Sequence, residues 1–243
     1  EINRGLISGF SEAFIIDENT KNELIIKDEK NSEIIKPLLR GKNIRRYKYE
    51  SNNQYLIHTH NGNKEKKIKP IDVINDYPTV FEYLKTFQSS LEKRQDKGNH
   101  WSNLRNCVYF DQLENPKIIY PDIAKGLNFA LDESGYFINN TAYFLNTGNR
   151  YLLAVLNSKL ASFYYNSITV QLGTMANRAF TIYIEQIPIP KIPDVKQQPF
   201  IILVNQIIEQ KQQGKDTTTL EAKIDELVYK LYDLTAEEIK IVE

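Results

Sequence analysis

Residues 34–47 concentrate positive charge. This stretch, IIKPLLRGKNIRRY, contains five basic side chains and no acidic one, and Lys48 follows it directly. The whole chain of 243 residues has 31 Lys and Arg against 31 Asp and Glu, so the cluster is a local feature. Lysine and arginine neutralise phosphates. The segment is therefore a candidate phosphate-binding surface, and the simpler alternative is a solvated basic loop. Its candidate contacts are Arg40, Lys42, Arg45, Arg46 and Lys48.

Two further polar loops have residue types suited to nucleic acid. The sequence KRQDKGNHWSNLRN, residues 93–106, places Trp101 and Arg105 among other cations. Cations pair with phosphates, and an aromatic ring can stack on a base. The sequence QLGTMANRAF, residues 171–180, contains Gln171, Asn177 and Arg178. Because Gln and Asn can read adenine and Arg can read guanine, this loop has the chemistry for base discrimination. The simpler alternatives are core packing for Trp101 and a solvated or ion-paired surface cation for Arg105.

Other chemistry has weaker support in the sequence. His58 and His60 form an H-x-H pair that a strand would place on one face, but no third metal ligand is near them in sequence. A nuclease motif could match Asp122 to Glu221 and Lys223, yet E-x-K is frequent by chance in a chain rich in these residues. The single cysteine, Cys107, lies in an apolar run typical of a buried thiol. We expect no catalytic residue and no metal site.

The elements that must position these loops alternate between strands and helices. Residues 6–17 read as a strand, a capping box at Thr20 and Glu23 predicts a helix, and Ser32 and Gly41 bound a second short helix. Residues 47–49 and 55–59 predict a hairpin, and residues 78–94 and 150–165 have helical periodicity. Further strands are predicted over 107–110, 117–120, 127–131, 136–138, 141–145 and 179–184, with a hairpin turn at the DESG of residues 132–135.

The last fifty residues differ in charge from the rest of the chain. Residues 1–193 have a net charge of +4 and residues 194–243 one of −4. A proline-rich connector, IPIPKIPDVKQQP, precedes two amphipathic segments around GKDTTT, which is an αα-hairpin pattern. Thr235 and Glu238 offer a last capping box. We predict a body over residues 1–193 and a C-terminal helical hairpin over residues 194–243.

Seven segments, in order, resemble one protein family. They are RGLISGFSEAFIID, IIKPLLRGKNIRRY, HWSNLR, KIIYPDIA, FINNTAYFL, LLAVLNSKLASFYY and IEQIPIP. Together they are similar to the TaqI-like C-terminal specificity domain, the target recognition domain of adenine-specific DNA methyltransferases, including type IIG restriction-modification enzymes and the related BREX methyltransferases. The resemblance covers about residues 5–190. It implies an α/β (α+β) fold with a mixed or antiparallel sheet, flanking helices and a C-terminal helical hairpin.

The resemblance also implies a division of labour. In such enzymes a separate domain binds S-adenosylmethionine and carries an Asn-Pro-Pro-Tyr-type motif, while the specificity domain reads double-stranded DNA and the adenine is flipped out. This chain has no Pro-Pro dipeptide, so we expect no cofactor and no methyl transfer here. The family's basic segment corresponds to Arg40, Lys42, Arg45 and Arg46, and its W-x-x-L-R pattern to Trp101 and Arg105.

These features give two functional expectations. The first is a DNA recognition module attached to a methyltransferase catalytic domain of the same polypeptide, with or without a nuclease. The alternative is an interaction or scaffold module that assembles through its C-terminal helices, so helix-mediated self-association is possible. The start, EINRGLISGF, has no initiator Met and no signal peptide, which suggests a piece of a longer cytoplasmic protein. No apolar run is long enough for a membrane span.

Overall fold

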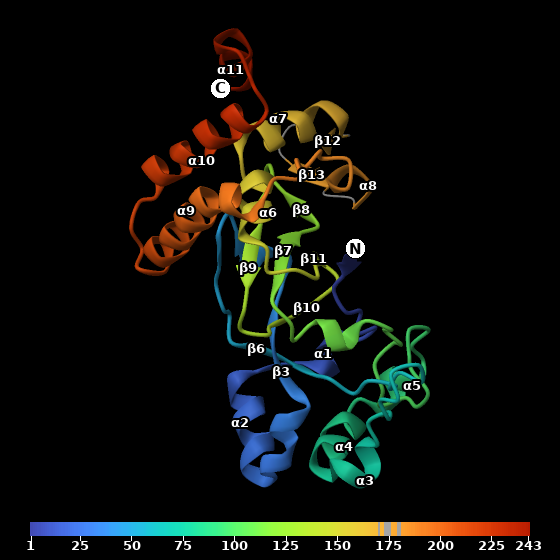
Figure 1. The fold of residues 1–243 in the computed structure, drawn as a ribbon. Helices are drawn as coiled ribbons and strands as arrows, with labels where there is room; N and C mark the ends of the chain where they lie inside the picture. The colour runs from blue at the N-terminus through green and yellow to red at the C-terminus, as the bar shows by residue number, and fades with distance from the viewer. Residues whose placement is uncertain (170, 173–175, 179–180) are drawn as a thin grey trace.

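The computed structural model describes residues 1–169, 171–172, 176–178 and 181–243, and describes 171–172 and 176–178 by their backbone only. Figure 1 shows two lobes joined by sheets, with helices α2 to α5 at one end and α6 to α11 at the other. The helices are α1 (Ser11–Phe14), α2 (Glu18–Lys27), α3 (Val73–Asp76), α4 (Pro78–Lys85), α5 (Gln88–Glu92), α6 (Arg150–Leu156), α7 (Lys159–Ile168), α8 (Thr181–Ile184), α9 (Asp194–Gln212), α10 (Thr218–Leu231) and α11 (Ala236–Val242).

Two four-stranded sheets form the centre. The first has the order β10-β3-β6-β2 and is mixed, because β10 runs parallel to β3. The second, β1-β11-β7-β9, is antiparallel. Smaller sheets are β12-β13-β8 and the hairpin β4-β5. The strands are β1 (Ile2–Arg4), β2 (Ile15–Asp17), β3 (Ile35–Leu39), β4 (Ile44–Arg45), β5 (Lys48–Tyr49), β6 (Gln54–Ile57), β7 (Lys117–Pro121), β8 (Ile123–Ala124), β9 (Ala130–Asp132), β10 (Phe137–Ile138), β11 (Ala142–Leu145), β12 (Gln171–Leu172) and β13 (Ala176–Arg178).

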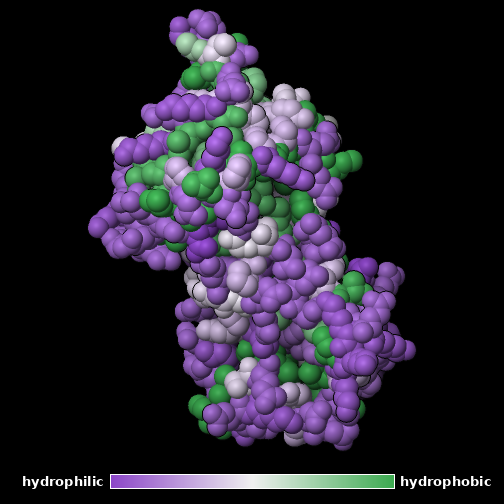
Figure 2. Space-filling view, in the orientation of Figure 1, coloured by the Kyte–Doolittle hydropathy of each residue, from purple (hydrophilic) through white to green (hydrophobic). Residues whose placement is uncertain are grey.

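The second sheet separates two apolar cores. Because side chains alternate across a strand, Ile119 and Phe144 face the first core, while Ile118 and Tyr143 face the second. This explains why all five residues of β7 are buried. The second core also contains Val204 and other residues of α9 and α10, so the C-terminal hairpin packs on α6, and α9 also contacts β5. Figure 2 shows hydrophobic residues among the helices of this lobe and a mostly hydrophilic surface on the other.

Several predicted elements are confirmed. The helices predicted over 78–94 and 150–165 form as the pairs α4–α5 and α6–α7, and Ser158 caps α7 by accepting a bond from the Ala161 N–H. Strands β7 and β11 lie where the apolar runs placed them, and α9 and α10 form the αα-hairpin. The capping box of Thr235 and Glu238 is present at α11.

The helix predicted between Ser32 and Gly41 is wrong. Residues 35–39 instead form β3, which is bonded to β6 on one side and to β10 on the other. Pro37 lacks an N–H and disfavours a helix interior, and the branched Ile35 suits a strand. The basic segment therefore leaves a central strand rather than a helix. At α2 the cap is Asp17, whose carboxylate accepts from the Thr20 N–H, rather than Thr20 itself.

Both predicted hairpins are also wrong in their pairing. Residues 48–49 pair with β4, while β6 pairs with β2 and β3. The DESG turn connects two different sheets, because β9 pairs with β7 and β10 with β3. Residues 107–110 form no strand; Val108 is 65% exposed while Phe110 is buried. Of the strand predicted over 179–184, residues 181–184 are helix α8 and the other two lie outside the described residues.

Candidate nucleic-acid interface

The basic segment folds into a compact unit, residues 40–49, called the basic hairpin below. The Asn43 carboxamide oxygen accepts from the Arg40 N–H at 2.9 Å, and the Arg40 carbonyl accepts from the Asn43 N–H at 2.8 Å. Gly41 fits against residue Thr141, where a Cβ would lie 2.2 Å from the Thr141 carbonyl oxygen. A left-handed Tyr47 then turns the chain from β4 into β5. Backbone geometry therefore fixes how the cations project.

Three cations of the basic hairpin, Arg40, Lys42 and Arg45, form no salt bridge in the described part of the chain, although the charge of Arg45 adds to that of Lys48 in lowering the pKa of Glu50. Lys42 and Arg45 are exposed, and the Arg45 Nη1 donates to the Lys42 and Ile44 carbonyls at 2.7 and 2.9 Å. Arg40 is half-buried, and its Nε is buried without a hydrogen-bond partner among the described residues. A buried donor without a partner is costly, so an oxyanion that accepts from Arg40 would remove that cost.

The other two predicted contacts of the basic hairpin have acidic partners. The Arg46 Nε lies 3.2 Å from Glu221 Oε2 on α10, and Lys211 of α9 approaches the other oxygen of that carboxylate at 2.9 Å. The Lys48 Nζ lies 2.9 Å from Glu50. DNA would have to replace these ion pairs, so the DNA contacts of Arg46 and Lys48 stay predictions.

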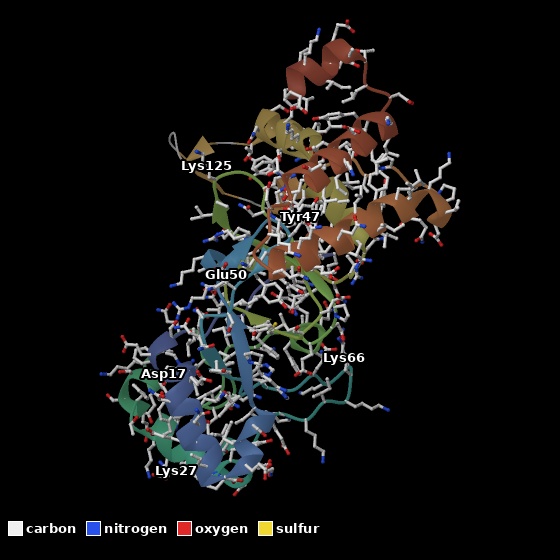
Figure 3. The ribbon with its side chains drawn as sticks, turned by 90° about the vertical axis from the view of Figure 1, so that its left-hand side faces the viewer. Asp17, Lys27, Tyr47, Glu50, Lys66 and Lys125 are labelled. Atoms are coloured by element: carbon white, nitrogen blue, oxygen red, sulfur yellow. The ribbon has the colours of Figure 1, made fainter. Side chains whose placement is uncertain are left out.

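Two tyrosines anchor the basic hairpin. Tyr47 is buried where the hairpin meets the C-terminal helices, and its N–H donates to the Phe129 carbonyl at 2.8 Å (Figure 3). Burial raises the pKa of Tyr47, so its hydroxyl stays neutral. The Tyr49 hydroxyl donates at 3.1 Å to Asp132, which also pairs with the fully buried Lys117 at 2.5 Å. Burial lowers the pKa of Lys117, and the Asp132 carboxylate opposes that shift.

The Trp101 loop lies against the first core. The Trp101 ring is half-buried and its centre lies 5.4 Å from that of the Phe81 ring, so this side chain takes part in core packing. The buried Arg94 organises this loop by donating to the carbonyls of Ser8, Trp101 and Asn103. Arg105 is exposed and lies 3.0 Å from Asp96. Arg105 is thus available to a ligand, while stacking by Trp101 stays a prediction.

The predicted reading loop joins the edge of β8. In backbone register, Gln171 pairs with Asn177 across β12 and β13, Asn177 with Ala124, and Arg178 with Ile123. The side chains of Gln171, Asn177 and Arg178 lie outside the described part, as do residues 173–175 entirely. The turn after β8 is described, and it projects the exposed Lys125 (Figure 3).

Arg4 is a candidate that the sequence reasoning missed. It ends the edge strand β1, its Nε donates to the Asn140 carbonyl at 3.0 Å, and its guanidinium lies 5.7 Å from the centre of the Tyr143 ring. An Nη2–Asp122 contact of 3.6 Å connects it to the residue before β8. The available signal was its place at the start of the segment RGLISGF.

The turn 139–141 connects the predicted segments. Arg4 is bonded to Asn140, and the Gly41 N–H of the basic hairpin donates to the Thr141 hydroxyl at 2.8 Å. The Thr141 carbonyl accepts from the Asp122 N–H at 2.8 Å, just before β8. The basic hairpin, Arg4 and the β8–β13 edge therefore adjoin at one turn.

The two histidines form no metal centre in the described residues. His58 and His60 have ring centres 5.1 Å apart, but no group of three potential ligands occurs in the described part of the chain. His58 is buried, and burial holds its pKa well below 6.5. The His60 Nδ1 accepts from the Gly62 N–H at 3.0 Å, so this ring is also used structurally. Within the same residues, no helix is long and apolar enough to cross a membrane.

Comparisons with known proteins identify the family and the fold of the chain. A family model described as the TaqI-like C-terminal specificity domain matches residues 36–189. The type II methyltransferase M.MjaIV of Methanocaldococcus jannaschii is 30% identical over 237 residues, which cover 92% of this chain and 76% of that protein. The type II methyltransferase M.BanIII of Aneurinibacillus aneurinilyticus is 25% identical over 186 residues, covering 72% of this chain and 32% of that protein.

Two solved structures share the fold. The type IIL restriction-modification enzyme MmeI, determined in complex with DNA, aligns over 97% of this chain and 33% of its own, with a TM-score of 0.75 and 10% identity. The type IIG restriction endonuclease BpuSI aligns over 94% and 30%, with a TM-score of 0.51 and 14% identity. The chain thus spans about a third of each of these enzymes.

Proposed function

The chain belongs to the family of TaqI-like C-terminal specificity domains, and on that premise we propose that it holds and reads duplex DNA for a methyltransferase domain. Methyl transfer and the binding of S-adenosylmethionine would belong to that separate domain. Double-stranded DNA and the catalytic domain are then its two partners. Both relatives are named as type II methyltransferases, which supports the proposed association with a methyltransferase domain.

One observation carries the proposal. Cations without acidic partners in the described residues, Arg40 and Lys42, adjoin the β8–β13 edge through the turn 139–141. Phosphate contacts fix register and base contacts provide specificity, and both kinds of group are needed within one footprint. We assign the phosphate role to Arg40, Lys42, Arg45 and Arg105, and the base-reading role to Gln171, Asn177 and Arg178.

A salt series with duplex DNA tests the proposal. The triple variant Arg40→Ala, Lys42→Ala, Arg45→Ala should bind at least about tenfold more weakly at low salt, because three phosphate contacts are lost. Each lost contact should also reduce the steepness of log K against log salt by about 1. Fluorescence anisotropy of a labelled duplex measures both quantities.

A matched variant controls for overall charge. The variant Lys27→Ala, Lys64→Ala, Lys69→Ala removes the same charge from exposed residues elsewhere. Figure 3 labels Lys27, and it labels Lys66, which lies between Lys64 and Lys69 in the sequence. This control should bind nearly as the parent does. Equal losses in the two triple variants, or no binding even at low salt, would refute the proposal. The scaffold alternative instead expects concentration-dependent oligomers in sedimentation without DNA binding.

A further inference from the structure

A hollow lies between the segment that follows β1 and the loop that follows Trp101. Its volume is about 240 Å³, and two arginines, Arg4 and Arg105, line it from opposite segments. The remaining lining comes from residues 5–7 and 106–109, so the hollow has no Asp or Glu in its wall. We call it the two-arginine hollow.

The geometry of Arg4 suits an oxyanion. Its side chain is 40% exposed, and the bond to Asn140 and the contact with the Tyr143 ring hold the guanidinium in place. A held guanidinium loses little side-chain freedom when it binds, and its planar fork matches two phosphate oxygens. In the described residues these contacts engage the Nε and Nη2 of Arg4, which leaves Nη1 for a ligand.

Arg105 supplies the second cation. Its side chain is 50% exposed, and its carboxylate partner Asp96 is also largely exposed, so the pair is screened by water and weak. The Arg4–Asp122 contact is longer, at 3.6 Å. Neither partner lines the hollow. A phosphate placed between the two guanidiniums would therefore meet positive charge from two sides.

The hollow adjoins the proposed interface. Arg4 is bonded to Asn140, in the same turn that contacts the basic hairpin and the residue before β8. We propose that the two-arginine hollow binds a phosphate group of the DNA backbone, next to the bases read from the β8–β13 edge. This inference rests on the proposed DNA-binding function and adds Arg4 and the hollow to it.

The only cysteine of the chain offers a direct probe. Cys107 lines the hollow and is half-buried, and burial raises the pKa of its thiol, so it should react slowly but measurably with iodoacetamide. Saturating duplex DNA should slow alkylation of Cys107 several-fold, as followed by mass spectrometry. The Cys107→Ser variant, which should show no labelling, verifies that the signal comes from this thiol.

Arginine variants connect the protection to the cations. In Arg4→Ala, Arg105→Ala, protection should be lost, and the salt slope of duplex binding should fall by about 2. The pair Arg4→Lys, Arg105→Lys keeps the charges but not the fork, so protection should return in part. Lysine variants also guard against an effect of Arg4→Ala on folding, which circular dichroism checks.

The outcomes separate the two proposals. If the protein binds duplex DNA but saturating DNA does not slow the alkylation of Cys107, the proposal for the two-arginine hollow is wrong and the proposed DNA-binding function stands. Absence of duplex binding at any salt overturns both. If inorganic phosphate protects Cys107 as fully as duplex DNA, and the duplex slope is the same in Arg4→Ala, Arg105→Ala, the hollow is a site for free phosphate and the backbone assignment is wrong.

Discussion

The two sides of the basic hairpin have the same kind of residue but different surroundings. Arg45 is exposed and bonded only to nearby carbonyls, whereas Arg46, the next residue, points to Glu221 on α10. Tyr47 and Tyr49 lie on the inward side with Arg46, and Lys42 lies outward with Arg45. Positive charge along the sequence therefore does not identify the ligand contacts. The partner of each cation does, and the partners here come from distant parts of the chain.

The difference predicts opposite consequences of substitution. An outward cation forms no salt bridge in the described residues, so its removal leaves no buried charge unpaired in the folded protein. An inward residue belongs to a network whose other members stay buried after it is removed, and that is costly. Inward changes should thus alter the free energy of unfolding, and outward changes should alter DNA affinity.

The largest effect is expected at the inner end of the hairpin. Asp132→Ala removes the partner of the fully buried Lys117 and an acceptor of the Tyr49 hydroxyl. Removing one member of a buried pair costs about 3–5 kcal/mol, so urea unfolding should show a loss of this size. Glu50→Ala, which breaks the Lys48–Glu50 pair and removes the exposed carboxylate near Arg45, should cost about 1 kcal/mol or less. Similar losses in both variants would contradict the comparison.

The second test contrasts the two adjacent arginines. Arg45→Ala should weaken duplex binding several-fold, lower the salt slope by about 1, and change stability by no more than about 0.5 kcal/mol. Arg46→Ala should instead lower stability and leave the slope nearly unchanged, because its guanidinium is paired with Glu221. Anisotropy and urea unfolding on the same preparations measure both. An equal slope change in the two variants would mean that DNA displaces Glu221 from Arg46.

Much of this fold could be predicted from local pattern. The apolar spacing of residues 78–94 and 150–165 and the capping box at Thr235 gave correct helices, since each depends on neighbours in sequence. The incorrect predictions concerned which strands pair with each other. Strand β10 joins β3 rather than β9, a choice set by how the two cores close. For residues 35–39 a short apolar run fits either helix or strand, and Pro37 was the local signal against a helix.

The candidate site was predictable only as a set of loops. Composition singled out the basic segment and the Trp101 loop, and the structure joins them through Arg4, an isolated cation outside any basic cluster of the sequence. The ion pair of Arg46 depends on a helix near the C-terminus, so no local signal could reveal it. The DNA contacts at Gln171, Asn177 and Arg178 stay predictions.

A smaller effect is expected for the pair between Arg46 and Glu221. Both side chains keep some contact with water, and such pairs contribute about 0.2–1 kcal/mol. A double-mutant cycle with Arg46→Ala and Glu221→Ala should yield a coupling free energy in that range. Lys211 also contacts Glu221, so Lys211→Ala in each background separates its share. A coupling of zero would mean that burial of Tyr47 alone holds the hairpin against α10.

The smallest effect is a pH dependence on the inward side. Asp225 of α10 is 4% exposed, accepts from the Lys159 N–H at 2.8 Å, and lies near Arg46, Lys159 and Glu243. Burial raises its pKa above the ordinary value of 3.8. The folded state then holds the proton to higher pH than the unfolded chain does, so this group lowers stability as pH rises from 3.8 through the folded pKa.

Substituting Asp225 isolates that contribution. Asp225→Asn cannot titrate and keeps an oxygen for the Lys159 N–H, so its free energy of unfolding should rise relative to the parent as pH increases through this window, then stay level. Urea unfolding of both proteins between about pH 4 and 7 measures the difference. If the parent gains on the variant instead, attraction from Arg46 and Lys159 outweighs burial, and the inward side would be held by charge rather than by packing.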